Sequence, residues 1–327
     1  MTKTVLVTGG AGYVGSHTCK ALARAGWRVV VYDNLERGWR DLVKWGDLIE
    51  GDLLDPAALK AAFDTVKPDA VAHFAALAYV GESVTHPERY YRNNLLGTLN
   101  LLEAMAGAGT NKLVFSSTCA IYAPTNAPLT EDMPQSPVNP YGASKMMAER
   151  VIRDFGAAHG IRSVSLRYFN ASGCDADGEI GERHEPETHV IPLILRGVMQ
   201  DDYAFTINGN DFPTRDGTCV RDYVHVADLA SAHVQALHYL DEGGNTDAFN
   251  LGTGKGTTVS ELVSAVERVS GLSIPRKYGP RRDGDPPSLV AAPDKARKVL
   301  GWLPEQSDID HILRTAKLWA EQEASRT

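Results

Sequence analysis

The stretch VLVTGGAGYVGSHTCKAL, residues 5–22 of a 327-residue chain, decides the fold. It begins as a β-branched strand, turns through Gly9-x-x-Gly12-x-x-Gly15 and continues in a helical pattern. Glycines at this spacing permit a tight turn and let a pyrophosphate approach the backbone, where the helix presents free N–H groups. Because the triplet joins a strand to a helix, it predicts a dinucleotide-binding site rather than an ordinary turn.

The first 170 residues alternate short apolar strands with helical patterns. Further strands are predicted in WRVVVYD, LIEGDLLD, AVAHFAA, KLVFSST and SVSLRYFN. Strands rich in Val, Leu and Ile that alternate with helices are typical of a parallel sheet covered on both faces. The predicted fold class is therefore α/β, a Rossmann-type doubly wound parallel sheet with a smaller interleaved C-terminal substrate lobe. Its ligands are expected at the carboxyl ends of the strands.

Several helices are predicted from end signals. Asp55 is expected to cap a helix that begins at Pro56, a long helix is expected over about residues 89–105, and Thr258 with Glu261 predicts a capping box. Another helix is expected from Tyr141 onward.

After residue 170 the pattern is looser. A polar loop is expected up to residue 189, then a helix in VIPLILRGVM, a helix entry and helix in VRDYVHVADLASAHVQAL, and a strand in AFNLGTG that returns to the main sheet. The predicted domains are a cofactor domain at 1–170, with returning segments near 215–252, and an interleaved substrate lobe at 171–327.

Composition argues against several functions. The chain is 43% hydrophobic and 23% charged with a net charge of −8, which disfavours broad attraction to nucleic acid or anionic membranes. No apolar run approaches the length of a membrane span, and the N-terminus leads directly into a strand, so neither a membrane partner nor a signal peptide is expected. Four scattered cysteines favour reduced thiols in a cytoplasmic protein and no metal cluster.

Acidic residues follow two of the predicted strands. Asp33 ends the second strand, where a carboxylate can bind the adenosine ribose and repel a 2′-phosphate, which favours NAD over NADP. Arg37, four residues later, leaves some room for NADP. Asp52 ends the third predicted strand. It either faces the adenine or lies at the surface, and both interpretations stay open.

The segment NPYGASK, residues 139–145, contains a candidate catalytic pair. Tyr141 and Lys145 are four residues apart, so a helix places both on one face. A free tyrosine has a pKa of about 10, and a neighbouring ammonium would favour its phenolate. Thr118, at the end of the fifth strand, adds a hydroxyl. The three residues predict a proton-transfer site beside the cofactor.

These motifs together resemble the extended short-chain dehydrogenase/reductase family, and within it the enzymes that epimerise nucleotide sugars. The resemblance extends over nearly the whole chain, through VTGGAGYVGSHT, YDNL, EGD, HFAA, VGESV, YYRNN, FSST, YGASK, LRYFN, GNDFPTRDGTCVRDYVHVADLA, NLGTG and RRDGDPP. It implies reversible 4-epimerisation of UDP-glucose and UDP-galactose through a transient 4-keto sugar and bound NAD. It also implies a UDP-hexose as substrate and a homodimer.

The resemblance also implies roles for individual residues. Tyr141 would take the proton of the sugar 4-hydroxyl, Lys145 would lower its pKa and bind the nicotinamide ribose, and Thr118 would assist. The NAD site would comprise Gly9, Gly12, Tyr13, Val14, Gly15, Asp33, Asn34, Asp52, Leu53, Phe74, Ala75, Ala76, Asn93, Tyr141, Lys145 and Phe169. The substrate would contact Thr118, Tyr141, Asn170, His189, Arg221, Arg282, Asp285 and Leu289.

Several positions depart from the family pattern. Thr118 stands where many members have serine, Ala78 where some have lysine, and His189 where others have asparagine. Leu289 stands where enzymes restricted to glucose and galactose often have tyrosine. Two interpretations stay open for this shorter side chain: the pocket admits N-acetylated sugars, or other residues refill the space.

The same sequence also bears on other functions. His184 and His189 stand among glutamates, but no open coordination motif is recognisable, so a polar loop is favoured and no metal site is expected. A nucleotide-sugar dehydratase usually has an acidic pair after the strand-end threonine, where this chain has Cys119 and Ala120. Another NAD-dependent nucleotide-sugar epimerase stays open, whereas non-catalytic NAD sensors typically lack the Tyr/Lys pair.

Overall fold

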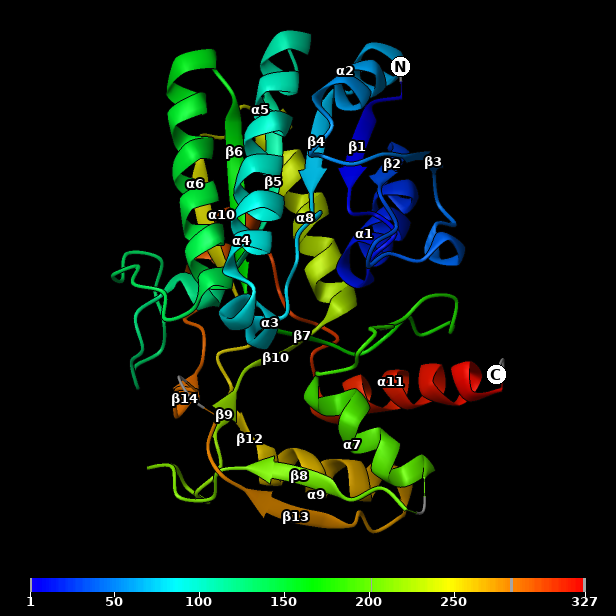
Figure 1. Ribbon diagram of the computed structural model, residues 1–327, viewed down its shortest axis with the longest axis vertical. Coiled ribbons are helices and arrows are strands. Elements are labelled where there is room, and N and C mark those ends of the chain that lie inside the picture. Colours follow the sequence, from blue (N-terminus) through cyan, green and yellow to red (C-terminus); the bar gives the residue numbers. More distant parts are fainter. Residues whose placement is uncertain (1, 201, 283–284, 326–327) are drawn as a thin grey trace.

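The computed structural model describes residues 2–200, 202–282 and 285–325. Its main element is a parallel sheet of seven strands in the order β11-β6-β5-β4-β1-β2-β3 (Figure 1). The strands are β1 (Thr4–Thr8), β2 (Arg28–Asp33), β3 (Asp47–Glu50), β4 (Ala70–His73), β5 (Lys112–Thr118), β6 (Arg162–Tyr168) and β11 (Asp247–Leu251). The order reverses at β1, which leaves a crevice at the strand ends where such sheets bind ligands. The predicted doubly wound α/β fold is therefore confirmed.

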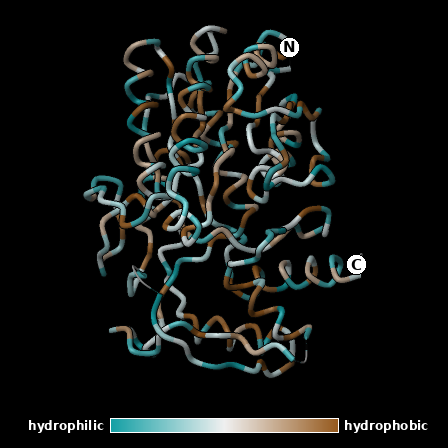
Figure 2. The backbone as a smooth tube through the Cα atoms, viewed as in Figure 1, coloured by the Kyte–Doolittle hydropathy of each residue, from teal (hydrophilic) through white to brown (hydrophobic). Residues whose placement is uncertain are grey.

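Helices cover both faces of this sheet. On one face lie α1 (Tyr13–Arg24), α8 (Val226–Asp241) and α10 (Asp294–Leu300), and on the other lie α2 (Pro56–Val66), α5 (Gly97–Ala108) and α6 (Pro140–His159). The period of two in each strand explains this: Val5 and Val7 pack toward α1 and α8, while Leu6 packs toward α2, α5 and α6. Hydrophobic segments consequently run through the interior (Figure 2).

A second core lies beyond the carboxyl ends of the strands. It contains α7 (Val190–Met199), α9 (Val259–Ser270), α11 (Ile309–Ala324) and the parallel pair β8 (Phe205–Asn208) and β13 (Arg276–Gly279) (Figure 1). The helix predicted in VIPLILRGVM is confirmed as α7, and the capping box of Thr258 and Glu261 is present at α9.

Short strands connect the two cores. β7 (Asn170–Ser172) pairs with β10 (Tyr223–His225), and β9 (Val220–Arg221) pairs with β12 (Thr257–Thr258) and β14 (Ser288–Leu289). The helix predicted in VRDYVHVADLASAHVQAL is confirmed as α8, but its entry VRDYVH forms β9 and β10, because this backbone bonds to distant strands that local periodicity does not reveal. The predicted strand in AFNLGTG is confirmed as β11, paired with β6, while the domain limits stay a prediction.

Two further boundaries differ from expectation. The long helix predicted over residues 89–105 is divided into α4 (Pro87–Tyr90), a π-helical segment (Tyr91–Leu96) and α5, preceded by α3 (Val80–Thr85). The third strand ends at Glu50 rather than at Asp52, because the Asp52 carboxylate accepts the backbone N–H of Leu54 at 2.8 Å and closes a turn. Two 3₁₀ turns complete the described elements, Arg40–Leu42 and Cys119–Ile121.

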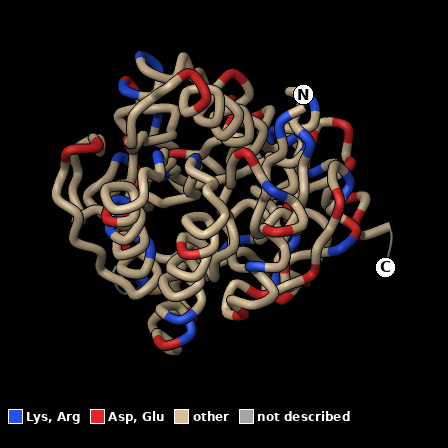
Figure 3. Tube along the Cα trace, turned by 90° about the horizontal axis from the view of Figure 1, so that it is seen from above, with Lys and Arg blue, Asp and Glu red and all other residues tan. Residues whose placement is uncertain are grey.

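Charges of both signs are interspersed over the outside of the molecule (Figure 3). The four cysteines are free and buried. Among the described residues, every helix is too short or too polar to cross a membrane.

Candidate active site

One cavity of about 310 Å³ at the carboxyl ends of the strands brings the predicted cofactor residues together. Every residue assigned to the NAD site from the sequence lines this cavity. Thr118, Asn170 and His189 of the predicted substrate set line it as well. Its volume lies at the small end of the range of about 300–1,000 Å³ that is usual for ligand pockets.

The glycine turn shapes the floor of this cavity. Gly9 has a φ of 75°, and a Cβ there would lie 2.4 Å from the backbone nitrogen of Ala75. A Cβ on Gly15 would lie 2.2 Å from the carbonyl oxygen of Gly9. Gly12 is the N-cap of α1 and supplies no capping side chain, so an anionic pyrophosphate can satisfy the first N–H groups of the helix. The residues present therefore fit a dinucleotide.

Asp33 and Arg37 bear on which dinucleotide fits. The Asp33 carboxylate accepts the backbone N–H groups of Ala11 and Leu35; burial raises its pKa, and these two bonds oppose the rise. Arg37 donates to Glu82 and to the carbonyl of Glu185 at 3.1 and 2.7 Å. Because Arg37 is already engaged, the geometry favours a ribose without a 2′-phosphate.

The catalytic candidates come from β5 and the first turns of α6. Asn139 caps α6 by accepting the N–H of Gly142 at 2.8 Å. A Cβ on Gly142 would lie 2.2 Å from the carbonyl oxygen of Ala120, so glycine lets α6 begin directly against the end of β5. Tyr141 and Lys145 then face the cavity together with Thr118, as the spacing predicts.

Burial controls the protonation of the pair. It raises the pKa of Tyr141 above its usual value, Tyr168 adds to the rise, and a hydrogen bond with Thr118 lowers it. Burial lowers the pKa of Lys145 to about 7, an effect that Glu149 opposes, and the ammonium donates to the Ser116 carbonyl at 2.8 Å. Each charge alone is disfavoured, so a phenolate and an ammonium formed together would stabilise each other.

Thr118 is positioned to support a phenolate. Its hydroxyl oxygen accepts the N–H of Ala120 at 3.1 Å, which leaves its own hydrogen for Tyr141. Behind the pair, Glu149 on α6 forms two hydrogen bonds with Arg167 of β6, at 2.9 and 2.6 Å, and accepts the hydroxyl of Ser117 at 2.6 Å. This buried network fixes α6 against the sheet.

The remaining substrate candidates lie on the short strands. Arg221 of β9 is opposite Leu289 of β14 and forms an ion pair with Asp285. Leu289 packs in a cluster that contains Phe169, so it borders the cofactor side. Arg282 is exposed, and the RRDGDPP motif includes residues 283–284, which lie outside the described residues. None of these four candidates lines the cofactor cavity.

Some residues of the site were not found from the sequence. Ser116 and Tyr168 line the cavity at the ends of β5 and β6, and strand-end position is a signal that could have found them. Glu182 and His184 also line it, from a loop whose only signal was alternation of acid and histidine. The buried carboxylate of Asp222 accepts N–H groups of Thr253, Gly254 and Ala291. It thereby holds the loops that contain these residues beside Arg221. The sequence around Asp222 contains no local signal of this role.

The fold and the site together define a dinucleotide-binding enzyme of the Rossmann type. A model of the NAD dependent epimerase/dehydratase family matches residues 5–252, and the chain belongs to that family. It is 53% identical over 318 residues to the UDP-glucose 4-epimerase of Rhizobium leguminosarum bv. trifolii, with 97% of each chain covered.

Solved structures agree with this. UDP-glucose 4-epimerase from Brucella ovis in complex with NAD is 50% identical with a TM-score of 0.93, over 97% of this chain and 98% of that one. The UDP-Glc/GlcNAc 4-epimerase of Campylobacter jejuni is 38% identical with a TM-score of 0.86, over 98% of this chain and 99% of that one.

Proposed function

We propose that this protein is an isomerase that interconverts UDP-glucose and UDP-galactose by inverting C4 of the hexose, with NAD as a bound cofactor. The observation that carries the proposal is the meeting of Tyr141, Lys145 and Thr118 on the wall of the cavity that the cofactor residues line. The names of its relatives, at up to 53% identity over nearly full length, support the same activity.

Tyr141 acts as the base that removes the proton of the 4-hydroxyl. Lys145 supplies the cation that favours the phenolate, and Thr118 donates a hydrogen bond to the phenolate oxygen. NAD, when bound, supplies the redox chemistry at C4. After the transient 4-keto sugar has rotated in the pocket, Tyr141 returns the proton to the 4-oxygen. The protein is therefore unchanged at the end of each cycle.

Turning the sugar requires a firm hold elsewhere on the substrate. Arg221 and Arg282, with Asn170 and His189, bind the UDP moiety, since guanidinium groups suit phosphate oxygens. Asp285 forms an ion pair with Arg221 and thereby orients it for the phosphate. A tight grip on UDP and a looser hexose pocket hold the keto sugar while it rotates.

Mixing the purified protein with UDP-galactose and measuring UDP-glucose tests the proposal. Conversion without net consumption of NAD is expected. Protein that binds NAD but converts neither sugar would contradict it and favour a sensor or another sugar. Formation of a 4-keto-6-deoxy sugar would instead indicate a dehydratase, which the turn at Cys119–Ile121 disfavours because it places no acid after Thr118.

A second substrate pair is favoured by Leu289. This side chain is half-buried beside Phe169 and is shorter than the tyrosine that walls off C2 in restricted enzymes. The proposal is that UDP-N-acetylglucosamine and UDP-N-acetylgalactosamine are also interconverted. Absence of conversion at high enzyme concentration, with UDP-galactose active, would contradict this extension and leave the main activity intact.

The protein is also proposed to be a homodimer. Four apolar side chains are exposed on α3, the π-helical segment and α6, namely Val80, Val84, Leu96 and Met147. Because α3 and the π-helical segment both contact α6, these side chains support a subunit interface at these helices. Light scattering should give twice the mass of 35.4 kDa, and Met147→Glu should reduce it; a monomeric wild type would contradict the proposal.

A cytoplasmic location is proposed as well. Four free, buried thiols are usual in a reducing compartment. Fractionation of the source cells tests this, and recovery outside the cytoplasm would contradict it.

A further inference from the structure

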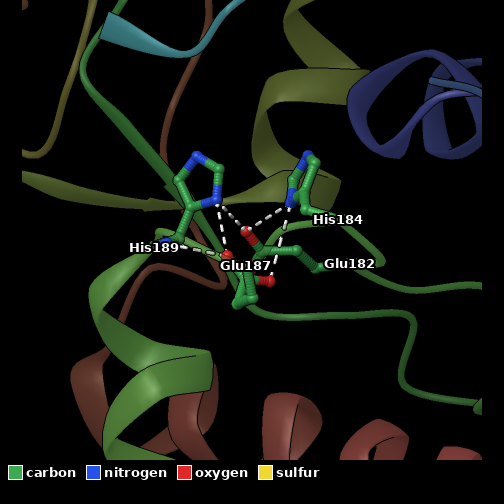
Figure 4. Close-up of side chains that lie close together, drawn as sticks. All are labelled: Glu182, His184, Glu187 and His189. Atoms are coloured by element: carbon green, nitrogen blue, oxygen red, sulfur yellow. Dashed lines mark hydrogen bonds and ion pairs between the residues drawn. The ribbon is translucent and has the colours of Figure 1, made fainter. Parts of the chain in front are cut away.

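The loop before α7 brings two glutamates and two histidines to one point. Glu182, His184, Glu187 and His189 each offer one ligand atom, and these atoms all lie within 4.8 Å of one another (Figure 4). Both imidazoles direct Nδ1 toward the carboxylates (Figure 4). A polar loop was expected here from the sequence; the structure adds convergence, which spacing did not reveal.

The separations suit a tetrahedral metal site. His184 Nδ1 lies 3.3 Å from Glu182 Oε1 and 3.7 Å from Glu187 Oε2. His189 Nδ1 lies 3.1 Å from Glu182 Oε1 and 2.9 Å from Glu187 Oε1. Zinc bonds to nitrogen and carboxylate oxygen are about 2.0–2.2 Å long, so the edges of a tetrahedral site measure about 3.3–3.6 Å. The four nitrogen–oxygen separations, in which Glu187 is represented by Oε2 toward His184 and by Oε1 toward His189, bracket these edges.

Imidazoles are the only basic side chains that face the two carboxylates in the described part of the chain. The side chains of Glu182 and Glu187 are only 5% and 11% exposed. Within the described part of the chain, their ion-pair partners are the two histidines alone, with neither lysine nor arginine. Glu182 Oε1 and His184 Nδ1 are buried without a hydrogen-bond partner there. A divalent cation would satisfy both atoms and offset both charges.

The ligand candidates are also held in place. Glu187 Oε1 accepts the backbone N–H groups of Thr188 and His189, each at 2.7 Å, which fixes the carboxylate. The His184 ring packs edge-on against Tyr13 and Tyr79, with centroids 6.1 and 5.9 Å away. In metal sites, such supporting contacts orient the residues that bind the ion directly.

A second acidic cluster provides a contrast. Asp175, Asp177 and Glu179 also converge, but Lys20 already occupies their centre at 2.6, 3.2 and 2.6 Å. Lys20 supplies this positive charge, whereas among the described residues neither lysine nor arginine forms an ion pair with Glu182 or Glu187.

We propose that His184, His189, Glu182 and Glu187 bind one zinc-like divalent cation. Two imidazoles and two carboxylates are ligands that zinc accepts in tetrahedral sites. Glu182, His184 and His189 also line the cofactor cavity. The bound ion would therefore hold this loop in place beside the cofactor. Metal binding through Nδ1 leaves Nε2 of His189 as a donor for the substrate diphosphate.

Metal titration of the untagged holoprotein, first treated with a chelator, tests this. Calorimetry with zinc is expected to show one ion per chain, and cobalt(II) in its place is expected to give the visible spectrum of a tetrahedral site. His184→Gln and Glu187→Gln should each weaken zinc binding by about tenfold or more. His86→Gln, which removes an exposed histidine on the connection between α3 and α4, is the matched control and should bind as wild type.

Wild-type protein that binds less than one zinc per chain, or an octahedral cobalt spectrum, would overturn the proposal. So would equal zinc binding by the wild type and both variants. Circular dichroism identifies a variant that fails to fold, and the wild-type stoichiometry and cobalt spectrum then decide. UDP-galactose conversion is measured separately. Failure of the metal proposal can therefore be distinguished from failure of the proposed reaction.

Discussion

The cofactor side and the substrate side of this enzyme are built differently. Most of the predicted cofactor residues stand at or directly after the ends of strands of one sheet, and all of them line one cavity. Substrate candidates such as Arg221, Asp285 and Leu289 stand on two-residue strands and a loop that meet only through distant pairing. The sheet positions the first side, whereas the second depends on a few contacts between distant segments.

This difference suits the reaction. A cofactor that stays bound needs a preformed cavity, and a sugar that must turn needs a hold on its nucleotide with freedom at the hexose. Tyr141 lies at the junction, on a helix anchored to the sheet by Glu149 and Arg167. Substitutions on either side should therefore separate cofactor binding, substrate binding and turnover.

The largest effect is expected at the junction. Tyr141→Phe removes the phenolic oxygen of the proposed base and keeps the ring, so kcat should fall by about 10²–10⁴-fold. NAD binding and UDP affinity, measured by calorimetry, should stay near wild type. A kcat within a few-fold of wild type would show that Tyr141 is not the base.

Lys145 tests whether burial tunes the cofactor side. Its folded pKa of about 7 lies below the value of 10.5 for a free lysine, so between these pH values the unfolded chain binds more protons. Relative to Lys145→Met, the cofactor-free wild type should gain up to about 1.4 kcal/mol of stability per pH unit from pH 7 to 10.5.

Urea unfolding across this range measures the difference. Lys60→Met, at an exposed lysine of α2, is the control and should follow the wild type. A constant difference between wild type and Lys145→Met would contradict the depressed pKa. In the holoenzyme, Lys145→Ala should move the acidic limb of the pH–kcat profile toward higher pH, since the phenolate loses its cation.

Gly15→Ala addresses the cofactor side alone. Its Cβ would lie 2.2 Å from the Gly9 carbonyl oxygen, so the turn must open, at a cost of about 1–3 kcal/mol, with weaker NAD binding. Gly107→Ala in α5 meets no atom within 4 Å and is the matched control. Calorimetry with NAD and thermal unfolding report both effects; unchanged NAD affinity would place the pyrophosphate elsewhere.

Arg221→Lys addresses the substrate side alone. Lysine keeps the charge but loses the forked donor, so KM for UDP-galactose should rise about tenfold with little change in NAD affinity. Steady-state kinetics with and without added NAD separate the two. If KM is unaltered, Arg221 does not hold the diphosphate.

The smallest effect on UDP-galactose turnover is expected at Leu289. Leu289→Tyr should leave UDP-galactose turnover within a few-fold but lower conversion of N-acetylated substrates about 10–200-fold, the usual range for a steric pocket. Rates for both substrate pairs give the ratio. An unaltered ratio would mean that other residues set the space at C2.

Prediction from the sequence succeeded where the signal was local. The turn at Gly9–Gly15 lies within one strand–turn–helix unit, and Tyr141 and Lys145 lie about one helical turn apart. Residue spacing was therefore sufficient to predict both features. It failed where distant pairing decided the structure, as at β9 and β10. The engagement of Arg37 likewise depends on its bonds to Glu82 and Glu185, which lie far from it in the sequence.

The sequence by itself determined the parallel α/β fold, the glycine turn and the shared helix face of Tyr141 and Lys145, because strand ends and helix faces follow from short-range order. Only the tertiary structure decided the pairing of Arg221 with Asp285, the depressed pKa of Lys145 and the convergence of residues 182–189. These depend on burial and on contacts between distant segments. Neither the local dielectric environment nor a loop's path through space is encoded in residue spacing.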